Sequence, residues 1–251
     1  MDLGLSRRVY VVTGGSRGLG LAVAEELVRE GARVVVSGRT DETLRDAVSR
    51  LGDGATGVVA DLADPESPER LLGHARDSFG RVDGALISVG GPPTGGVLEV
   101  TDEQWRSAFD SVFVGAVRMA RAAAAALGDG GSLAFVLSSS VKEPIDGLAI
   151  SNGLRPGLAM VVKDLARAVG ARGIRVNGLM PARIETDRVR SLDQAQADPS
   201  AARAANEAAI PLGRYGTPEE FARVAAFVLS PAASYVNAAV LPVDGGQLRS
   251  L

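Results

Sequence analysis

A glycine-rich turn near the N-terminus is the first segment whose residue types could do chemistry. Residues 13–20 read Thr-Gly-Gly-Ser-Arg-Gly-Leu-Gly and follow a short apolar run at 8–12. Glycines at this spacing let the backbone approach a pyrophosphate, and the helix that follows offers unpaired N–H groups and the positive end of its dipole. The turn therefore predicts a nucleotide-phosphate site formed by Gly14, Ser16, Arg17, Gly18, Leu19 and Gly20.

The composition limits what other chemistry the chain can do. Its 251 residues include no cysteine and one histidine, His74, in a polar helical stretch that predicts a surface position. These counts exclude thiolate metal sites, cysteine nucleophiles and sites that need two imidazoles, so we predict no metal centre. The 27 basic and 30 acidic residues give a net charge of −3, which argues against nucleic acid as a partner. No apolar run reaches the roughly 18 residues of a membrane span and no secretory leader is recognisable, so we expect a cytoplasmic protein without a membrane partner.

The elements that must position the glycine turn alternate between strands and helices. Seven short apolar runs read as strands, at 8–12, 34–36, 57–60, 84–88, 132–137, 174–179 and 239–243. Helical patterns separate them, and this alternation predicts right-handed βαβ units around a sheet buried on both faces. We therefore expect a single α/β domain over residues 1–251, of the Rossmann type and doubly wound, with a mainly parallel seven-stranded sheet.

Within this domain we assign residues 1–130 to a nucleotide-binding half and residues 131–251 to a half that carries the active site. The segment 186–210 is helical in composition but is interrupted by Asp198 and Pro199. It is either a mobile lid over the crevice or a peripheral helix pair.

Motifs along the whole chain resemble the short-chain dehydrogenase/reductase family. Besides the glycine turn they include the Arg-Val-Asn run at 175–177 and the Val-Asp-Gly-Gly run at 243–246. The segment 210–220, Ile-Pro-Leu-Gly-Arg-Tyr-Gly-Thr-Pro-Glu-Glu, resembles the β-ketoacyl-carrier-protein reductase branch. The resemblance implies a nicotinamide-dependent oxidoreductase with further cofactor contacts at Asp61, Leu62, Ser88, Gly90, Arg155, Pro181 and Thr186.

Arg39, at the end of the second expected strand, predicts which nicotinamide cofactor is bound. An acidic residue there would accept a hydrogen bond from the ribose 2′-hydroxyl, whereas an arginine accommodates a 2′-phosphate. Arg39 and Arg17 could both donate charge-assisted hydrogen bonds to that phosphate, so we predict NADP(H). The alternative is that both are solvated surface charges.

The positions that the family uses for catalysis are only partly retained. The family uses Asn, Ser, Tyr and Lys, with Tyr as the acid/base and Lys lowering its pKa. Ser138 stands at the serine position, although the two serines that follow leave this register open by one or two residues. Ser151 replaces the tyrosine, Arg155 replaces the lysine and Val112 replaces the asparagine.

The replaced pair cannot repeat the family's proton chemistry unchanged. Serine is not acidic near neutral pH without a partner base, and arginine does not give up its proton. Ser151 and Arg155 share one helix face, because they are four residues apart, so Arg155 could bond the nicotinamide ribose and stabilise an oxyanion. Their Ser-Asn-x-x-Arg context is similar to a branch of the family that carries both replacements together.

Lys142 is the candidate proton donor that remains. It lies four residues after Ser138, where the carboxyl ends of the strands should meet. A partly buried lysine can have a lowered pKa and act as a general acid. The alternative is a solvated loop lysine, paired with Glu143.

Three functions stay open on these residues. The first is hydride transfer between NADP(H) and a carbonyl or alcohol substrate, in a crevice lined by Ser138, Lys142, Ser151 and Arg155. The second is a catalytically silent NADP(H)-binding sensor or assembly partner, which the missing Tyr, Lys and Asn favour. The third is a dehydration or isomerisation with Glu143 or Asp146 as the base. The family resemblance also implies a homotetramer or homodimer, formed through the long helices 102–127 and 147–169.

Overall fold

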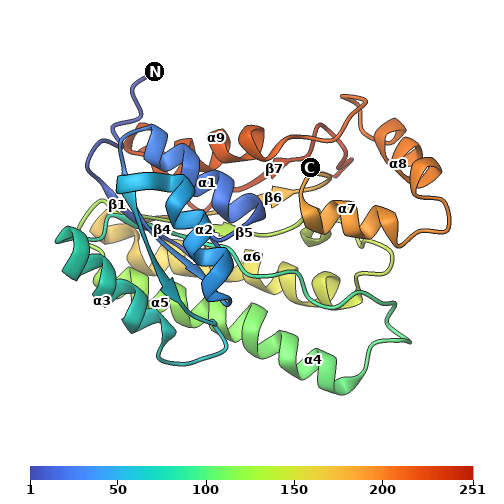
Figure 1. Cartoon of the computed structure of the whole chain (residues 1–251), viewed down its shortest axis with the longest axis horizontal. Coiled ribbons are helices and arrows are strands. Elements are labelled where there is room, and N and C mark those ends of the chain that lie inside the picture. Colours follow the sequence, from blue (N-terminus) through green and yellow to red (C-terminus); the bar gives the residue numbers. More distant parts are fainter. Residues whose placement is uncertain (251) are drawn as a thin grey trace.

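Seven parallel strands form one sheet through the middle of the protein (Figure 1). The structure is a computed structural model that describes residues 1–250. Its strands are β1 Val9–Val12, β2 Arg33–Gly38, β3 Ala55–Val59, β4 Gly84–Ile87, β5 Ser132–Val136, β6 Arg175–Pro181 and β7 Val240–Val243. Their order is β3-β2-β1-β4-β5-β6-β7, and every neighbouring pair is parallel. The predicted Rossmann-type, doubly wound sheet is therefore confirmed.

Helices cover both faces of this sheet (Figure 1). One face carries α1 Gly18–Arg29, α2 Asp41–Leu51 and α9 Pro218–Leu229. The other carries α3 Ser67–Phe79, α5 Gly115–Ala126 and α6 Ala149–Val169. Alternate strand residues pack towards opposite faces, so that Val11 joins one core and Val12 the other. This two-sided burial is the reason that the strand sequences are apolar without alternation.

The long helix expected at 102–127 is interrupted near its middle. It consists of α4 Asp102–Ala108, a π-helical turn at Phe109–Val114, and α5. Single π turns within α-helices are frequent at functional sites. Val112, at the family's asparagine position, lies in this turn with its side chain buried among apolar neighbours.

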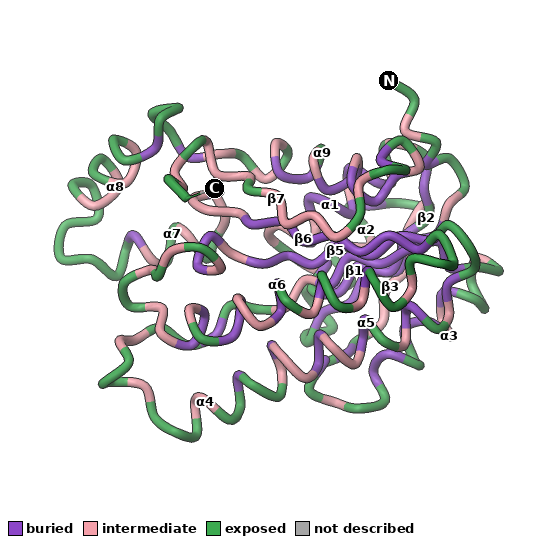
Figure 2. The backbone as a smooth tube through the Cα atoms, turned by 180° about the vertical axis from the view of Figure 1, so that it is seen from behind, coloured by how far each residue is buried: buried purple, intermediate pink, exposed green. Residues whose placement is uncertain are grey.

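Two helices project beyond the carboxyl edge of the sheet within the segment 186–210. They are α7 Asp187–Gln194 and α8 Pro199–Ala208. Asp198 caps the N-terminus of α8, because its carboxylate accepts hydrogen bonds from the N–H groups of Ser200 and Ala201. Figure 2 shows the contrast in burial between the purple strands and these mostly exposed helices. No helix in the described part of the chain is long and apolar enough to cross a bilayer.

Candidate active site

The glycine turn is packed as a ligand-binding backbone turn requires. Gly14 has φ +59°, and a Cβ there would lie 2.8 Å from the carbonyl oxygen of Ser88. A Cβ on Gly20 would collide with the carbonyl oxygen of Gly14, so the turn closes directly onto α1. Gly18 faces open space instead, since the nearest atom to a Cβ there would be the Thr186 methyl group at 4.0 Å. The turn therefore leaves room for a ligand at the N-terminus of α1.

The Thr13 hydroxyl ties the glycine turn to the end of β4. The side chain is fully buried, its Oγ1 accepts from the Ser88 N–H at 2.9 Å, and it lies 2.9 Å from the Ser88 carbonyl oxygen as a donor. β1 and β4 are the adjacent strands at which the strand order reverses, and this is where open α/β sheets bind ligands. The predicted residues Ser88 and Gly90 thus lie beside the glycine turn, and a Cβ on Gly90 would meet no atom within 4 Å.

The two arginines predicted to select the cofactor each follow one of two residues that pack against each other. Ser16, from the glycine turn, packs on Gly38 at the end of β2, where a Cβ would lie 2.7 Å from its hydroxyl oxygen. Arg17 and Arg39 are the next residues along the chain, and both side chains are exposed. Neither forms an ion pair with a carboxylate of residues 1–250. Both guanidinium groups are therefore available to an anion outside this contact.

Asp61 and Leu62 follow β3 at the same edge of the sheet. The Asp61 carboxylate accepts from the N–H of Ala63 at 3.0 Å and is otherwise exposed. Leu62 is buried, and its carbonyl oxygen approaches α5 at Gly115, where a Cβ would lie 2.5 Å from it. Gly115 thus allows the chain after β3 to pass close to α5 and to present Asp61 outward.

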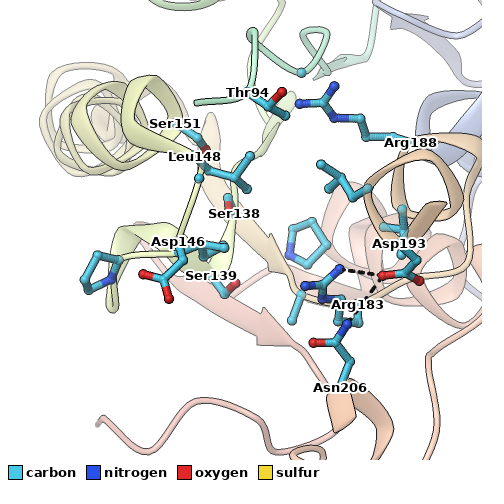
Figure 3. A pocket seen from close by; sticks show the side chains of 18 of the residues that line it. Thr94, Ser138, Ser139, Asp146, Leu148, Ser151, Arg183, Arg188, Asp193 and Asn206 are labelled. Carbon is cyan, nitrogen blue, oxygen red and sulfur yellow. Dashed lines mark hydrogen bonds and ion pairs between the residues drawn. The ribbon is translucent and has the colours of Figure 1, made fainter. Parts of the chain in front are cut away.

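A cavity of about 760 Å³ opens next to this edge, and residues of α7 and α8 form part of its lining (Figure 3). Three of the predicted catalytic residues, Ser138, Ser151 and Arg155, line it together with Pro181. The structure therefore brings these residues into one site, as their spacing predicts. On the facing side the lining includes Arg188, Asp193 and Asn206.

The three consecutive serines after β5 have different positions. Ser138 caps the 3-10 turn Ser139–Val141, and its Oγ accepts from the Ser140 N–H at 3.1 Å. Ser138 and Ser139 line the cavity, whereas Ser140 is buried behind them. The Ser140 hydroxyl is hydrogen-bonded to the hydroxyl of Ser151 at 3.1 Å. Ser138 and Ser139 therefore both face the cavity, Ser140 supports Ser151, and the assignment of Ser138 as the catalytic serine stays a prediction.

Among residues 1–250, Arg155 is a buried cation without a carboxylate partner. Its side chain is on the first turns of α6, and the residue is 5% exposed. Nη1 donates to the carbonyl oxygen of Val136 at 2.8 Å and Nη2 to that of Gly90 at 3.5 Å, but Nε has no partner. Burial lowers the pKa of Arg155 to about 10, so the guanidinium stays charged at neutral pH. Arg155 therefore brings a positive charge to the cavity lining that no carboxylate of residues 1–250 neutralises, and its Nε is buried without a hydrogen-bond partner among these residues.

Asn152, which the sequence analysis did not single out, fixes the loop between the serines and α6. Its Oδ1 accepts from the N–H of Ile145 at 3.0 Å, and its Nδ2 donates to the carbonyl oxygen of the same residue at 2.9 Å. This pair of bonds holds the loop 142–148 against the start of α6. The sequence signal for this role is the position of Asn152 between Ser151 and Arg155, since Asn side chains readily bond nearby backbone groups.

Lys142 is not brought to the site. Its side chain is exposed, and it is absent from the residues that line the cavity, although Glu143, Ile145 and Asp146 of the same loop are among them. The partial burial on which the proton-donor hypothesis depended is not found. Lys142 directly follows the 3-10 turn Ser139–Val141, and its side chain leaves that turn on the solvent side.

We expect the variant Lys142→Met to keep its turnover within about twofold, since an exposed side chain outside the cavity contributes little to its electrostatics. Steady-state kinetics with NADPH and a carbonyl substrate would check this. A loss of a hundredfold or more would return Lys142 to the role of proton donor.

A buried polar network holds α7 and α8. Asp193, at 7% exposure, accepts from the Tyr215 hydroxyl at 3.0 Å and from Arg183 at 3.2 Å, as Figure 3 shows for Arg183. Arg203 of α8 lies 4.7 Å from the centre of the Tyr215 ring and bonds both carboxylate oxygens of Glu185. Burial raises the pKa of the Tyr215 hydroxyl, so it stays a donor at neutral pH. Tyr215 thus anchors the helix pair and does not line the cavity.

The fold and the site together define the class. A parallel sheet that binds its ligand at the switch point, with a glycine turn on α1, is a dinucleotide-binding α/β domain. The chain belongs to the short-chain dehydrogenase/reductase family, since residues 14–247 match the family model described as enoyl-(acyl carrier protein) reductase. This match extends from the glycine turn to the C-terminal segment.

Individual relatives cover nearly the whole chain. The 3-oxoacyl-acyl-carrier-protein reductase of Vibrio cholerae is 30% identical over 246 residues, which is 97% of this chain and 98% of the relative. L-Rhamnose 1-dehydrogenase (NAD(P)(+)) of Azotobacter vinelandii is 32% identical, with the same two coverages. The crystal structure of L-sorbose reductase from Gluconobacter frateurii, complexed with NADPH and L-sorbose, is 30% identical with a TM-score of 0.92, and both chains are covered completely.

Proposed function

We propose that this protein is an NADP(H)-dependent oxidoreductase that transfers a hydride between the nicotinamide and a carbonyl or alcohol, with Ser151 and Arg155 in place of the family's Tyr and Lys. The observation that carries the proposal is the Arg155 guanidinium, buried at the base of the cavity with Nε unpartnered and Ser138 beside it in the lining. The family supports hydride transfer, and the NADPH in the L-sorbose reductase structure supports the cofactor.

The residues present fit the nucleotide. The open space at Gly18 and the close packing at Gly14 and Gly20 suit a pyrophosphate on the N-terminus of α1. Arg17 and Arg39 would hold the 2′-phosphate. Cofactor contacts at Ser16, Leu19, Asp61, Leu62, Ser88, Gly90, Arg155, Pro181 and Thr186 stay predictions. When bound, the nicotinamide supplies or accepts the hydride.

Arg155 would stabilise the charge that develops on the substrate oxygen. A preorganised cation lowers the energy of an oxyanion without reorganisation during the reaction. The Ser138 and Ser151 hydroxyls would orient the carbonyl, and Ser140 would hold Ser151 in place through the 3.1 Å hydroxyl contact. Because Arg155 keeps its own proton, the alkoxide would take a proton from water that enters the cavity, with Ser151 as the relay.

The test is turnover with a panel of aldehydes, ketones and β-ketoacyl thioesters, followed by the loss of nicotinamide absorbance with NADPH and then with NADH. We expect oxidation of NADPH by at least one carbonyl class, and a strong preference over NADH. Tight NADPH binding without turnover in either direction would instead support the silent sensor or assembly partner. Failure to bind either nucleotide would overturn both.

The third function, a dehydration or isomerisation, has less support because neither of its two candidate bases, Glu143 and Asp146, is in a suitable environment. Glu143 lines the cavity, but its Oε1 accepts from the N–H of Arg249 at 3.2 Å. Asp146 is exposed. Neither carboxylate is enclosed in the way that raises the basicity of a catalytic carboxylate.

The homotetramer or homodimer stays a prediction. Phe109, beside α4, is 44% exposed and Met160 of α6 is 69% exposed, so both long helices present apolar side chains to solvent. Exposed apolar side chains of this kind support an interface in which these helices pack against a second copy of the chain.

A further inference from the structure

A second arginine, Arg188 of α7, lines the cavity. Arg188 extends from α7 towards the loop after β4, where its Nη2 donates to the carbonyl oxygen of Pro92 at 2.8 Å (Figure 3). It packs so closely that a Cβ on Gly91 would lie 3.0 Å from its Nε. Within residues 1–250 no carboxylate forms an ion pair with it.

The loop 90–92 holds both unpaired arginines. The carbonyl oxygen of Gly90 accepts from Arg155, and that of Pro92 accepts from Arg188. Both arginines line the cavity, and both guanidinium groups therefore reach the same short loop of its lining. Arg155 is buried and Arg188 is exposed to solvent, and no carboxylate of residues 1–250 pairs with either of them. An anion in the cavity would be attracted by both charges.

The other charged groups that line the cavity do not provide that anion. Asp193 is engaged by Arg183 and by the Tyr215 hydroxyl. Glu143 is bonded to the backbone of Arg249, and Asp146 is exposed at the far side from Arg188 (Figure 3). The wall at 90–92 is therefore the cationic side of the cavity.

We propose, on the basis of the oxidoreductase function above, that the substrate is an oxo acid, or the corresponding hydroxy acid in the reverse direction. Its carbonyl oxygen faces Arg155 and the Ser138 and Ser151 hydroxyls, and its carboxylate is bound by Arg188. A guanidinium group matches a carboxylate with two parallel N–H donors, which makes Arg188 a specificity residue.

The experiment compares acids with their own neutral esters. The substrates are 2-oxobutanoate, 3-oxobutanoate and 4-oxopentanoate, each beside its ethyl ester, with saturating NADPH and neutral sugars as a further group. We expect kcat/KM for the preferred acid to exceed that for its ester by about tenfold or more, the value of one charge-assisted hydrogen bond. Arg188→Gln should reduce this ratio to about one, mainly through the KM of the acid, and Arg188→Lys should restore part of it.

Arg190→Gln is the matched control. Arg190 lies on the same helix, is exposed, bonds Asp187 at 2.6 Å and does not line the cavity. The ratio of acid to ester should stay at the wild-type value in this variant. A similar drop in both Arg188→Gln and Arg190→Gln would show a general effect of charge on α7 and would overturn the proposal.

Other outcomes also decide the matter. Esters or neutral sugars that are used as well as the acids would overturn it, as would an equal loss of NADPH affinity in Arg188→Gln. If no compound oxidises NADPH, the proposed function fails, but calorimetry with 4-oxopentanoate on the NADPH-loaded protein still tests the substrate class. Binding that is lost in Arg188→Gln supports an acid site, and no binding to the wild type overturns it.

Discussion

Arg155→Met is expected to lower kcat by about 10²–10³-fold and, at the same time, to stabilise the fold. The loss of rate follows because the variant removes the cationic donor at the base of the cavity, and one oxyanion donor is worth about this factor. Single-turnover measurements with NADPH already bound would locate the loss in the chemical step. Because burial lowers the pKa of Arg155 to about 10, the wild-type rate should also fall as the pH rises through that value and the cation is lost.

The gain in stability has a separate cause. A buried charge without an ionic partner costs several kcal/mol, and methionine fills a similar volume without that cost. The carbonyl oxygen of Val136 loses its donor, which costs about 1–3 kcal/mol in return. We expect a net increase in the free energy of unfolding of about 1–2 kcal/mol, visible as a rise of a few degrees in Tm.

Arg175 provides the matched control for this prediction. It is also a buried arginine, at 7% exposure, that has no carboxylate partner in the described part of the chain. Its guanidinium donates to the carbonyl oxygens of Val228 at 2.7 Å and Ser230 at 2.8 Å. Arg175→Met should therefore lower the Tm, because several buried acceptors lose their donor. If both variants destabilise the fold alike, Arg155 is a structural residue and its catalytic role is rejected.

Arg39→Asp is expected to change the cofactor preference by about a hundredfold or more. The variant replaces a donor to the 2′-phosphate with a repelling carboxylate, and the same carboxylate can accept from the 2′-hydroxyl of NADH. The loss of one charge-assisted hydrogen bond gives about 1.5–3 kcal/mol, and the repulsion adds to it. Dissociation constants for NADPH and NADH, measured by fluorescence titration at two salt concentrations, would check both the ratio and its electrostatic origin.

Arg45→Asp is the control for net charge. Arg45 is on α2, close in sequence to Arg39, and forms an exposed ion pair with Asp41. The Arg45→Asp variant makes the same change in charge as Arg39→Asp without altering the end of β2. The ratio of NADPH to NADH affinities should therefore stay near that of the wild type. An unchanged ratio in Arg39→Asp itself would mean that Arg39 is a solvated surface charge.

The fold was predictable because its signals are local. Most strands are short, mainly apolar runs that alternate with helices, so a parallel sheet follows from the order of the elements. The nucleotide turn was predictable for a similar reason, because Gly14 and Gly20 are needed by backbone contacts within a single strand–turn–helix unit.

The catalytic half was less predictable because its contacts join distant segments. The Arg155 guanidinium bonds carbonyl oxygens of β5 and of the loop after β4, and Asp193 of α7 bonds Tyr215 in the loop before α9. The exposure of Lys142 depends on the direction of one short turn. The π turn at Phe109–Val114 has no periodicity that differs from its flanking α-helices, so a helical pattern over the whole stretch was the natural prediction.

The helices α7 and α8 have a consequence for how the cavity opens. No side chain of α8 is buried, and Asp193 is the one buried residue of α7. The pair is held by charges and hydrogen bonds, so its detachment would expose little apolar surface. Such a local opening has a small heat-capacity change and a small denaturant dependence, but it weakens as salt screens its ion pairs. Access to the cavity would then follow the ionic strength of the solution more closely than its temperature.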